Sequence, residues 1–274
     1  QLQASQAPAH APADADAAAL SAALAQVTIV MVSYNSAHCF ARQGALLRAC
    51  PHVIVVDNGS DDGSAQQVSR HLPQARVLAL PRNLGFGAAN NRGLAQVATP
   101  FALLLNPDCD MQPQAIAALL EAARRWPDAA IVAPQLVEAG GGAEVNYRFA
   151  LTDWPARGAG AVGECCVGFV CGAAMLWRME RFTDVGWFDE RFFLYYEDDD
   201  LCLRLKQARR PMIIAPQVRA RHRSRGSVRG QRPWRAEYLR GYHHAQSKLI
   251  FSGRHMGQAQ ALRLRWRLLL GTAL

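Results

Sequence analysis

Five short apolar runs dominate the first half of the chain and limit the folds that it can adopt. They are VTIVMV (27–32), VIVVD (53–57), RVLAL (76–80), FALLL (101–105) and AAIVA (129–133). Each run is continuous and lacks the polar alternation of a strand with one wet face. Helix-compatible stretches separate the runs, at about 37–49, 62–71, 87–97 and 113–125. The pattern predicts an α/β fold, with a mostly parallel central sheet and helices on both of its faces.

The composition is that of a globular chain with a basic surface. Of the 274 residues, 50% are hydrophobic and 19% are charged, and the net charge is +8. This charge favours anionic partners such as phosphates, nucleic acid or an acidic membrane face. The seven cysteines form no CxxC pair and no spaced His/Cys set, which argues against a zinc site and a disulfide framework and favours a cytoplasmic location. No apolar run approaches the roughly 18 residues of a bilayer-spanning helix.

The chain divides into three predicted parts. Residues 1–26 are mostly Ala, Gln and Pro, so we expect a flexible N-terminal tail that is helical near its end. Residues 27–228 form the main domain, which divides into the halves 27–110 and 111–228. In the second half we expect a loop at 135–163, a strand pair within 165–177 and a strand at 211–216. Residues 229–274 are predicted to be a C-terminal helical segment.

Polar motifs follow four of the predicted strands, at the edge where open α/β sheets bind ligands. In chain order they are SYN (33–35), DNGSDDGS (57–64), PRNLGFGAANN (81–91) and NPDCD (106–110). Asp57 can accept N–H bonds from a nucleobase, although the same residues also serve as a plain turn. The run GFGAAN (85–90) resembles a dinucleotide fingerprint, but it follows the third strand, so we exclude NAD binding.

The NPDCD motif predicts a metal site. Asp108 and Asp110 are two residues apart, so in extended backbone both carboxylates point to one side. Hard oxygen ligands favour Mg²⁺ or Mn²⁺, which usually completes its coordination with substrate phosphates. An isolated Asp-x-Asp is frequent by accident, and the position at the sheet edge is what supports the hypothesis.

Four consecutive carboxylates, Glu197 to Asp200, stand at the start of a helix that is predicted over residues 198–207. They could simply stabilise the positive end of the helix. Successive helical residues are rotated by about 100°, so the four side chains cannot face one site. Asp198 shares its helical face with Leu201 and Leu205, which directs it toward the interior.

The order and spacing of these blocks resemble the inverting family 2 glycosyltransferases of GT-A fold, and most of all their rhamnosyltransferase-like branch. The resemblance covers about residues 27–228 and rests on VSYN, DNGSDDGS, NLGFGAANNRG, LLLNPDCD, GAAMLWR, GWFDERFFLYYEDDDLCLRLK and RHRSRGS. It implies that 27–110 is the nucleotide-binding half of the domain and 111–228 the acceptor and catalytic half. It further implies that Asp198 is the catalytic base and that Asp57 binds the nucleobase. It also implies Mg²⁺ or Mn²⁺ as cofactor, with Asp110, Asp108 and His222 as ligands.

The same resemblance implies a set of substrate-binding residues, and the sequence departs from it in two places. The set is Ser33, Asn35, Asp57, Asn83, Asn90, Asp108, Asp189, Glu190, Glu197, Arg223 and Arg225. Asp199 stands where many relatives carry a small apolar residue, and arginines replace the His or Gly that is more usual in RHRSRGS. These departures bear on donor and acceptor identity more than on reaction class. The expected partners are a nucleotide-diphospho-sugar donor and a glycan or lipid-linked saccharide acceptor.

Two basic segments have open interpretations. The arginines after residue 218 are either a flap that closes on the donor diphosphate or a solvated basic face. The segment ALRLRWRLLL (261–270) either lies on an anionic membrane surface, at the inner face of the cytoplasmic membrane, or packs against the domain.

Two other functions fit the sequence less well than glycosyl transfer. A sugar nucleotidyltransferase should carry a glycine-rich basic loop after its first strand, where this chain has SYNSAHC. A nucleic-acid or anion-binding module should interleave basic and aromatic residues on a strand face, whereas these arginines cluster after His222. We therefore expect no nucleic-acid partner.

Overall fold

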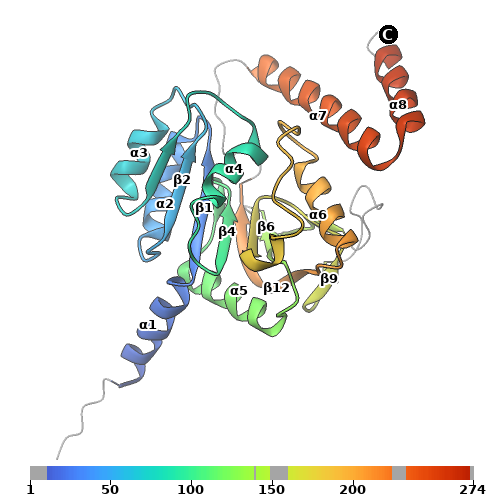
Figure 1. The fold of residues 1–274 in the computed structure, drawn as a ribbon. Coiled ribbons are helices and arrows are strands. Elements are labelled where there is room, and N and C mark those ends of the chain that lie inside the picture. The colour runs from blue at the N-terminus through green and yellow to red at the C-terminus, as the bar shows by residue number, and fades with distance from the viewer. Residues whose placement is uncertain (1–10, 139, 149–159, 224–232, 272–274) are drawn as a thin grey trace, which may run out of the picture.

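The computed structural model describes residues 11–138, 140–148, 160–223 and 233–271, which form a large sheet, a separate two-stranded sheet and flanking helices (Figure 1). The helices are α1 (Ala11–Leu24), α2 (Phe40–Leu47), α3 (Ser64–His71), α4 (Phe86–Leu94), α5 (Pro113–Arg125), α6 (Glu197–Gln207), α7 (Pro233–His255) and α8 (Gln258–Gly271). The longer strands are β1 (Val27–Ser33), β2 (Val53–Asp57), β3 (Arg76–Ala79), β4 (Phe101–Leu105), β6 (Ile131–Val137), β11 (Ala174–Arg178) and β12 (Met212–His222). The short strands are β5 (Cys109–Asp110), β7 (Ala143–Glu144), β8 (Tyr147–Arg148), β9 (Cys165–Val167) and β10 (Phe169–Val170).

The main sheet has the strand order β3-β2-β1-β4-β11-β6-β12-β5, with β7 and β9 paired at its side. Strands β1 to β4 are parallel to one another, and β12 is parallel to β6. Strand β11 lies antiparallel between β4 and β6, and β5 is antiparallel to β12. The sheet therefore runs through both predicted halves, and the α/β fold class with a mostly parallel sheet is confirmed.

Both faces of the sheet are buried, as the continuous apolar runs predicted. Leu103 and Leu105 of β4 pack in one cluster with side chains of α2, α3 and α5. Ala102 and Leu104 pack in the other, with side chains of α4 and α6. The two faces alternate residue by residue, so every position of the strand has to be apolar.

Two regions contain more regular structure than expected. Within the predicted N-terminal tail, residues 11–24 form α1, and Ala23 and Leu24 at its end are buried against the core, beside α5. Alanine has the highest helix propensity, which accounts for a helix with so few large side chains. The predicted loop 135–163 contains the end of β6, together with β7 and β8.

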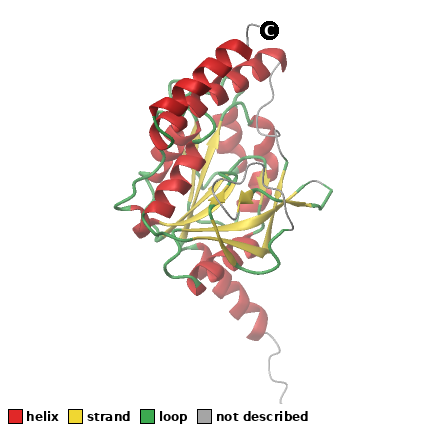
Figure 2. Cartoon of the chain, turned by 90° about the vertical axis from the view of Figure 1, so that its right-hand side faces the viewer, coloured by secondary structure: helices red, strands yellow, loops and turns green. Residues whose placement is uncertain are grey.

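The C-terminal part forms a helical hairpin. Helices α7 and α8 pack together and lie on the side of α6, at the end of the molecule toward which β1 and β2 run, whereas α1 leaves from the opposite end of the sheet (Figures 1 and 2). None of the helices in the described ranges has both the length and the apolar content needed to cross a bilayer.

Candidate active site

The loop after β2 folds back on the end of β1. Asp57 pairs in register with Ser33, and the Asn58 N–H donates to the Ser33 carbonyl at 2.8 Å. The Ser60 hydroxyl donates to Oδ1 of Asp57. The Ser33 hydroxyl is buried and makes no hydrogen bond within the described part of the chain. The two predicted residues therefore lie side by side on neighbouring strands.

Asn35 is used to hold this loop. Its backbone is left-handed, at φ 51°, and its N–H donates to the Ser60 hydroxyl at 3.0 Å. Its side-chain oxygen accepts the Asp61 N–H at 3.0 Å. An asparagine tolerates this conformation better than most residues, since its short side chain bonds locally.

Asn58 joins the second loop to the third and was not among the predicted site residues. Its Nδ2 donates to Oδ1 of Asn83 at 2.9 Å, and its Oδ1 accepts the Leu84 N–H at 2.8 Å. Gly59, at φ 74°, allows the two loops to approach, because a Cβ there would lie 2.6 Å from the Arg82 carbonyl carbon.

Hydrogen bonds from helix α4 hold the segment that precedes α6. The Phe86 N–H donates to the Phe193 carbonyl at 2.9 Å. Asn91 donates to the Phe188 carbonyl at 2.9 Å and accepts the Phe188 N–H at 3.1 Å. The predicted residue Asn90 instead bonds within its own helix, to the Phe86 carbonyl. Asn91, which the sequence did not single out, is thus the asparagine that fixes the distant loop.

The predicted substrate residues Asp189 and Glu190 both make ion pairs. Arg191 and Arg254 contact Asp189, and the hydrogen bond from Arg191 is the main cause that lowers the pKa of Asp189 to about 2. Arg92 donates to Glu190 at 2.8 Å. In the structure these carboxylates organise the loop, and their substrate-binding role stays a prediction.

The turn after β4 brings a carboxylate and an imidazole together. Strands β5 and β12 pair antiparallel, with His222 opposite Cys109. His222 Nε2 lies 3.8 Å from Oδ1 of the buried Asp108, and its Nδ1 lies 3.2 Å from Oε2 of Glu144. The pairing of distant segments places two of the three predicted metal ligands next to each other.

Asp110, the third predicted ligand, lies between two arginines. Arg42 Nε donates to its Oδ1 at 2.6 Å, while Arg223 Nε and Nη2 each lie 3.3 Å from its Oδ2. The backbone N–H of Arg223 also donates to the Asp108 carbonyl at 3.0 Å. Across the described ranges, no three His, Cys, Asp or Glu side chains are grouped as a metal site. Arg225 lies outside the described residues.

The four carboxylates at the start of α6 have four different environments. Asp198 Oδ2 accepts the Gly172 N–H at 3.2 Å, and Oδ1 accepts the Asp199 N–H at 3.0 Å. Burial raises the pKa of Asp198 to about 7, and the charge of Asp199 adds to the shift. Asp198 is therefore a carboxyl group that changes its protonation near neutral pH.

The neighbours of Asp198 serve other purposes. Burial raises the pKa of Glu197 well above its usual range, with a contribution from the Asp198 charge, and its Oε2 has no hydrogen-bond partner among the described residues. Asp199 forms an ion pair with the buried Arg148, whose guanidinium lies 3.8 Å from the centre of the Phe169 ring. The structure thereby supplies a partner for the unusual carboxylate at 199.

Asp200 is fully buried and ties α6 to α7. Arg204 Nε donates to its Oδ2 at 2.8 Å, and His255 Nε2 lies 2.7 Å from its Oδ1. Just before α6, Tyr195 and Tyr196 are both left-handed, at φ 69° and 65°. Such backbone is unfavourable for bulky residues, and rings of α7 pack on both tyrosines.

Two hydrogen bonds bring the acidic cluster and the NPDCD turn to one edge of the sheet. Gly172 donates to Asp198, and the carbonyl of the next residue, Ala173, accepts the Asn106 N–H at 3.0 Å. Asn106 is the first residue of NPDCD, two residues before Asp108. The predicted base and the predicted metal motif therefore share one short stretch of backbone.

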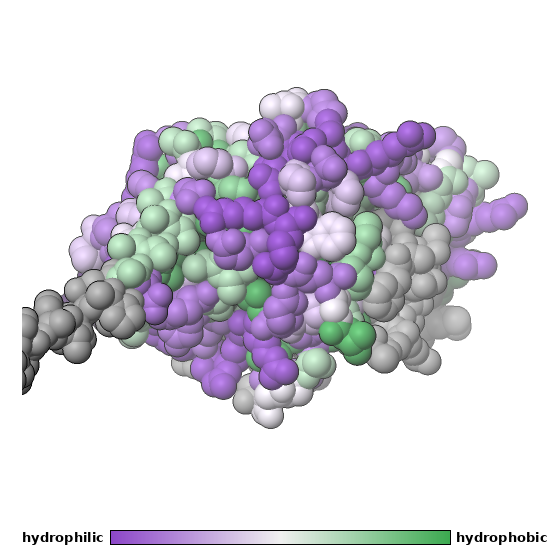
Figure 3. Space-filling view, turned by 90° about the horizontal axis from the view of Figure 1, so that it is seen from below, coloured by the Kyte–Doolittle hydropathy of each residue, from purple (hydrophilic) through white to green (hydrophobic). Residues whose placement is uncertain are grey.

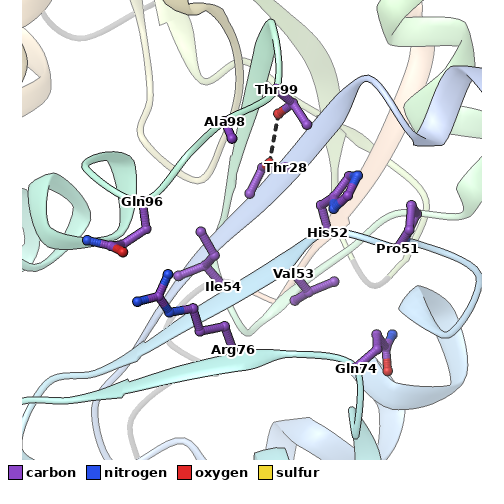
Figure 4. A pocket seen from close by; sticks show the side chains of 10 residues that line it. All are labelled: Thr28, Pro51, His52, Val53, Ile54, Gln74, Arg76, Gln96, Ala98 and Thr99. Carbon is purple, nitrogen blue, oxygen red and sulfur yellow. Dashed lines mark hydrogen bonds between the residues drawn. The ribbon is translucent and has the colours of Figure 1, made fainter.

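The opposite edge of the sheet has a different character. A pocket of about 410 Å³ opens there at the amino ends of β1, β2 and β3, lined among others by Thr28, His52, Gln74, Arg76 and Thr99 (Figure 4). Hydrophilic residues cover most of the centre of that lower face (Figure 3). None of the predicted site residues lines this pocket.

Comparison with known proteins identifies the family. Residues 28–179, over half of the chain, match the family model Glycosyl transferase family 2. The chain belongs to this family. The N-acetylglucosaminyl-diphospho-decaprenol L-rhamnosyltransferase of Mycobacterium tuberculosis is 32% identical over 247 residues, 79% of this family 2 chain and 79% of that protein. The pre-mycofactocin glycosyltransferase of the same organism is 32% identical over 219 residues, 74% of this chain and 44% of its own length.

Solved glycosyltransferases share the fold of this family 2 protein. A Pyrobaculum calidifontis mannosyltransferase, solved with GDP-Man and Mn²⁺, aligns with a TM-score of 0.58 at 16% identity, over 84% of this chain and 64% of its own. GalNAc-T7, solved with UDP, GalNAc and Mn²⁺, aligns with a TM-score of 0.56 at 14% identity, over 84% and 51%. The predicted GT-A fold and the predicted enzyme class, a glycosyltransferase with rhamnosyltransferase-like relatives, are confirmed. Family membership also decides against the nucleotidyltransferase and the binding module.

Proposed function

We propose that this glycosyltransferase transfers a sugar, such as rhamnose, from a nucleotide diphosphate to a hydroxyl of a glycan or lipid-linked saccharide, with inversion at the anomeric carbon. The observation that carries the proposal is Asp198: a carboxyl group with a pKa of about 7, held by the Gly172 N–H beside the NPDCD turn. A decaprenol-linked acceptor and an L-rhamnosyl donor stand in the name of the 32% identical relative, which supports this choice of substrates.

In this mechanism Asp198 is the general base. Its ionised carboxylate takes the proton of the acceptor hydroxyl as that oxygen attacks the anomeric carbon. The bond from this carbon to the donor diphosphate breaks on the opposite face, and the electron pair leaves with the diphosphate. A positioned base of this kind is typically worth about 10² to 10⁴ in rate. The Gly172 N–H holds the carboxylate in position.

Glu197 and Asp57 have separate binding tasks. Burial raises the pKa of Glu197 well above its usual range and so favours the protonated form, which can donate a hydrogen bond to a sugar oxygen. Asp57, with Ser33 beside it at the end of β1, accepts an N–H of the nucleobase. These tasks are proposals that rest on position and chemistry.

The NPDCD edge fits a divalent cation in the chemistry and spacing of its donors. Asp108 Oδ1 and His222 Nε2 lie 3.8 Å apart, so these two side chains would hold the cation together. The 3.3 Å contacts of Arg223 are long for a charge-assisted bond, so Oδ2 of Asp110 can exchange them for a cation. Bound Mg²⁺ or Mn²⁺ would stabilise the negative charge that develops on the leaving diphosphate. Arg42 and Arg223 contribute positive charge at the same place.

Donor binding and turnover test the proposal separately. The purified protein is mixed with dTDP-, UDP- and GDP-linked sugars, each with and without Mn²⁺, and thermal stabilisation and nucleotide release are measured. We expect one nucleotide to stabilise the protein in the presence of metal and to be released on adding a polyprenyl-diphosphate saccharide. The released product should have the opposite anomeric configuration to the donor. Retention of configuration, or no response to any nucleotide, would overturn the proposal.

A further inference from the structure

Helix α8 exposes a narrow apolar stripe. Four large side chains are each more than half exposed: Leu262 at 54%, Trp266 at 58%, Leu269 at 52% and Leu270 at 64%. At about 100° per residue, these four positions fall within an arc of about 100°. A second apolar set, Ala261, Leu264 and Leu268, lies half-buried on the other side of the helix. That side includes Ala261, whose Cβ lies 3.8 Å from where a Cβ on Gly253 of α7 would be.

Arginines flank the exposed stripe on both sides. Arg265 lies along one border, and Arg263 and Arg267 lie along the other, all three exposed. Helix α8 has no acidic residue. An apolar stripe between cationic side chains is the pattern of a helix that lies in the surface of an anionic bilayer.

Helix α7 adds aromatic side chains of the kind found at membrane interfaces. Trp234, Tyr238 and Tyr242 are 88%, 73% and 53% exposed and follow one another at four-residue spacing, so they form a single stripe. The α7–α8 hairpin lies on the side of α6, the helix that carries Asp198 (Figure 1).

We propose that the exposed stripe of α8, with the arginines along its borders, docks this enzyme on a bilayer rich in anionic lipid. Charge selects this occupant. A second copy of the same basic helix would bring arginine against arginine, and a nucleic acid would leave the leucines between the arginines without an apolar partner. This docking rests on the proposed function, because it would bring the enzyme to a lipid-linked acceptor in the membrane.

Helix α7 connects the docking helix α8 to the loop and helix that carry Asp198. Ser247 of α7 donates to the Leu194 carbonyl at 2.9 Å, and His255 contacts Asp200 of α6. Asp198 lies between these two contact points, Leu194 and Asp200, in the sequence. Docking of the hairpin would therefore fix the height of Asp198 above the bilayer, and with it the reach of a lipid-linked hydroxyl.

Co-sedimentation with vesicles tests the docking without reference to activity. Vesicles of phosphatidylcholine alone and of phosphatidylcholine with phosphatidylglycerol are compared. The variants are Trp266→Ser with Leu270→Ser, and Arg263, Arg265 and Arg267→Gln. The control is Val162→Ser, which changes a fully exposed apolar residue outside the hairpin. Circular dichroism verifies that each variant is folded.

We expect the wild type and the control to bind the anionic vesicles, and each hairpin variant to bind at least about tenfold more weakly. With a water-soluble acceptor, the variants should turn over like the wild type, and with a vesicle-borne acceptor they should be slower. The docking proposal would be overturned if the wild-type protein did not bind anionic vesicles, or if both variants bound them as tightly as the wild type. Self-association that the serine variant abolishes, without vesicle binding, would assign the stripe to a second copy instead. Vesicle binding without any sugar transfer would leave the docking standing and defeat the proposed function.

Discussion

His255 of α7 and Asp200 of α6 approach to 2.7 Å, from the imidazole Nε2 to the carboxylate Oδ1, and Asp200 is completely buried. Replacement of His255 with alanine removes a polar partner from a buried carboxylate, which should cost on the order of 1–3 kcal/mol of unfolding free energy. Because α6 carries Asp198, we also expect kcat to fall while the donor KM stays unchanged. Urea denaturation and steady-state kinetics measure the two effects.

The matched control for His255 is Arg210→Ala, which breaks the surface ion pair with Asp184. That variant should lose less than about 1 kcal/mol. Equal losses in the two variants, or a change in donor KM with kcat intact, would contradict a positioning role for the α6–α7 contact. Rescue of kcat by His255→Gln would support it.

Asp198→Asn should reduce turnover by about 10² to 10⁴ and leave donor binding intact. It should also stabilise the protein in a pH-dependent way. Because the folded-state pKa of about 7 lies above the unfolded value, the native state binds more protons between about pH 4 and 7, and wild-type stability falls as the pH rises through this range. The gain in Tm of Asp198→Asn should therefore be larger at pH 8 than at pH 4. A uniform change in Tm would show that the Asp198 charge is not the cause.

Asp199→Asn should shift the pH profile of kcat. The base has to be ionised, so wild-type activity should rise as the pH increases through about 7. The Asp199 charge raises the pKa of Asp198, so its removal should move the midpoint to lower pH. The variant leaves Arg148 buried without its carboxylate, so the double change Asp199→Asn with Arg148→Met serves to recover stability. An unchanged pH profile of kcat would show that the ionisation of Asp198 does not control the rate.

Chelation of divalent cations should abolish transfer, and added Mn²⁺ or Mg²⁺ should restore it. Asp110→Asn and His222→Ala should raise the metal concentration needed for half-maximal activity, because each removes one proposed ligand. His52→Ala, at the opposite edge of the sheet, is the control. Full activity in the presence of a chelator would refute the metal proposal, and an altered metal requirement in the control would make the effect unspecific.

Asn91→Ala should slow turnover although Asn91 is not proposed to touch substrate. It removes both hydrogen bonds to Phe188 and should cost about 1–3 kcal/mol. Asn90→Ala removes only a bond within α4 and should be milder in both stability and kcat. The reverse order, with Asn90 the more damaging position, would favour direct substrate contact by Asn90.

Much of the fold could be predicted from local patterns. Strands such as Phe101–Leu105 are apolar at every position because both faces are buried, and this property is visible without the structure. The location of the site, at the carboxyl ends of the strands, can be predicted from the parallel arrangement of the strands alone. The exposed face of α8 was harder to predict from the sequence, because apolar residues on two opposite sides of the helix hide its amphipathic character.

Pairing between distant side chains could not be predicted in the same way. Asn90 and Asn91 are identical neighbours, and only the position of Phe188, 97 residues later, decides which of them holds the loop. The Asp110 carboxylate meets Arg42 across 68 residues of chain, in a stretch with no motif of its own. Such contacts depend on how the sheet closes, which no local pattern specifies.

The left-handed pair Tyr195 and Tyr196 makes the length of the loop before α6 as important as its composition. The loop is anchored at the Phe193 carbonyl, only four residues before Glu197. One residue inserted or deleted between these points would turn the helix by about 100° and present a different carboxylate to Gly172. The number of residues in this stretch therefore decides which carboxylate of α6 reaches Gly172.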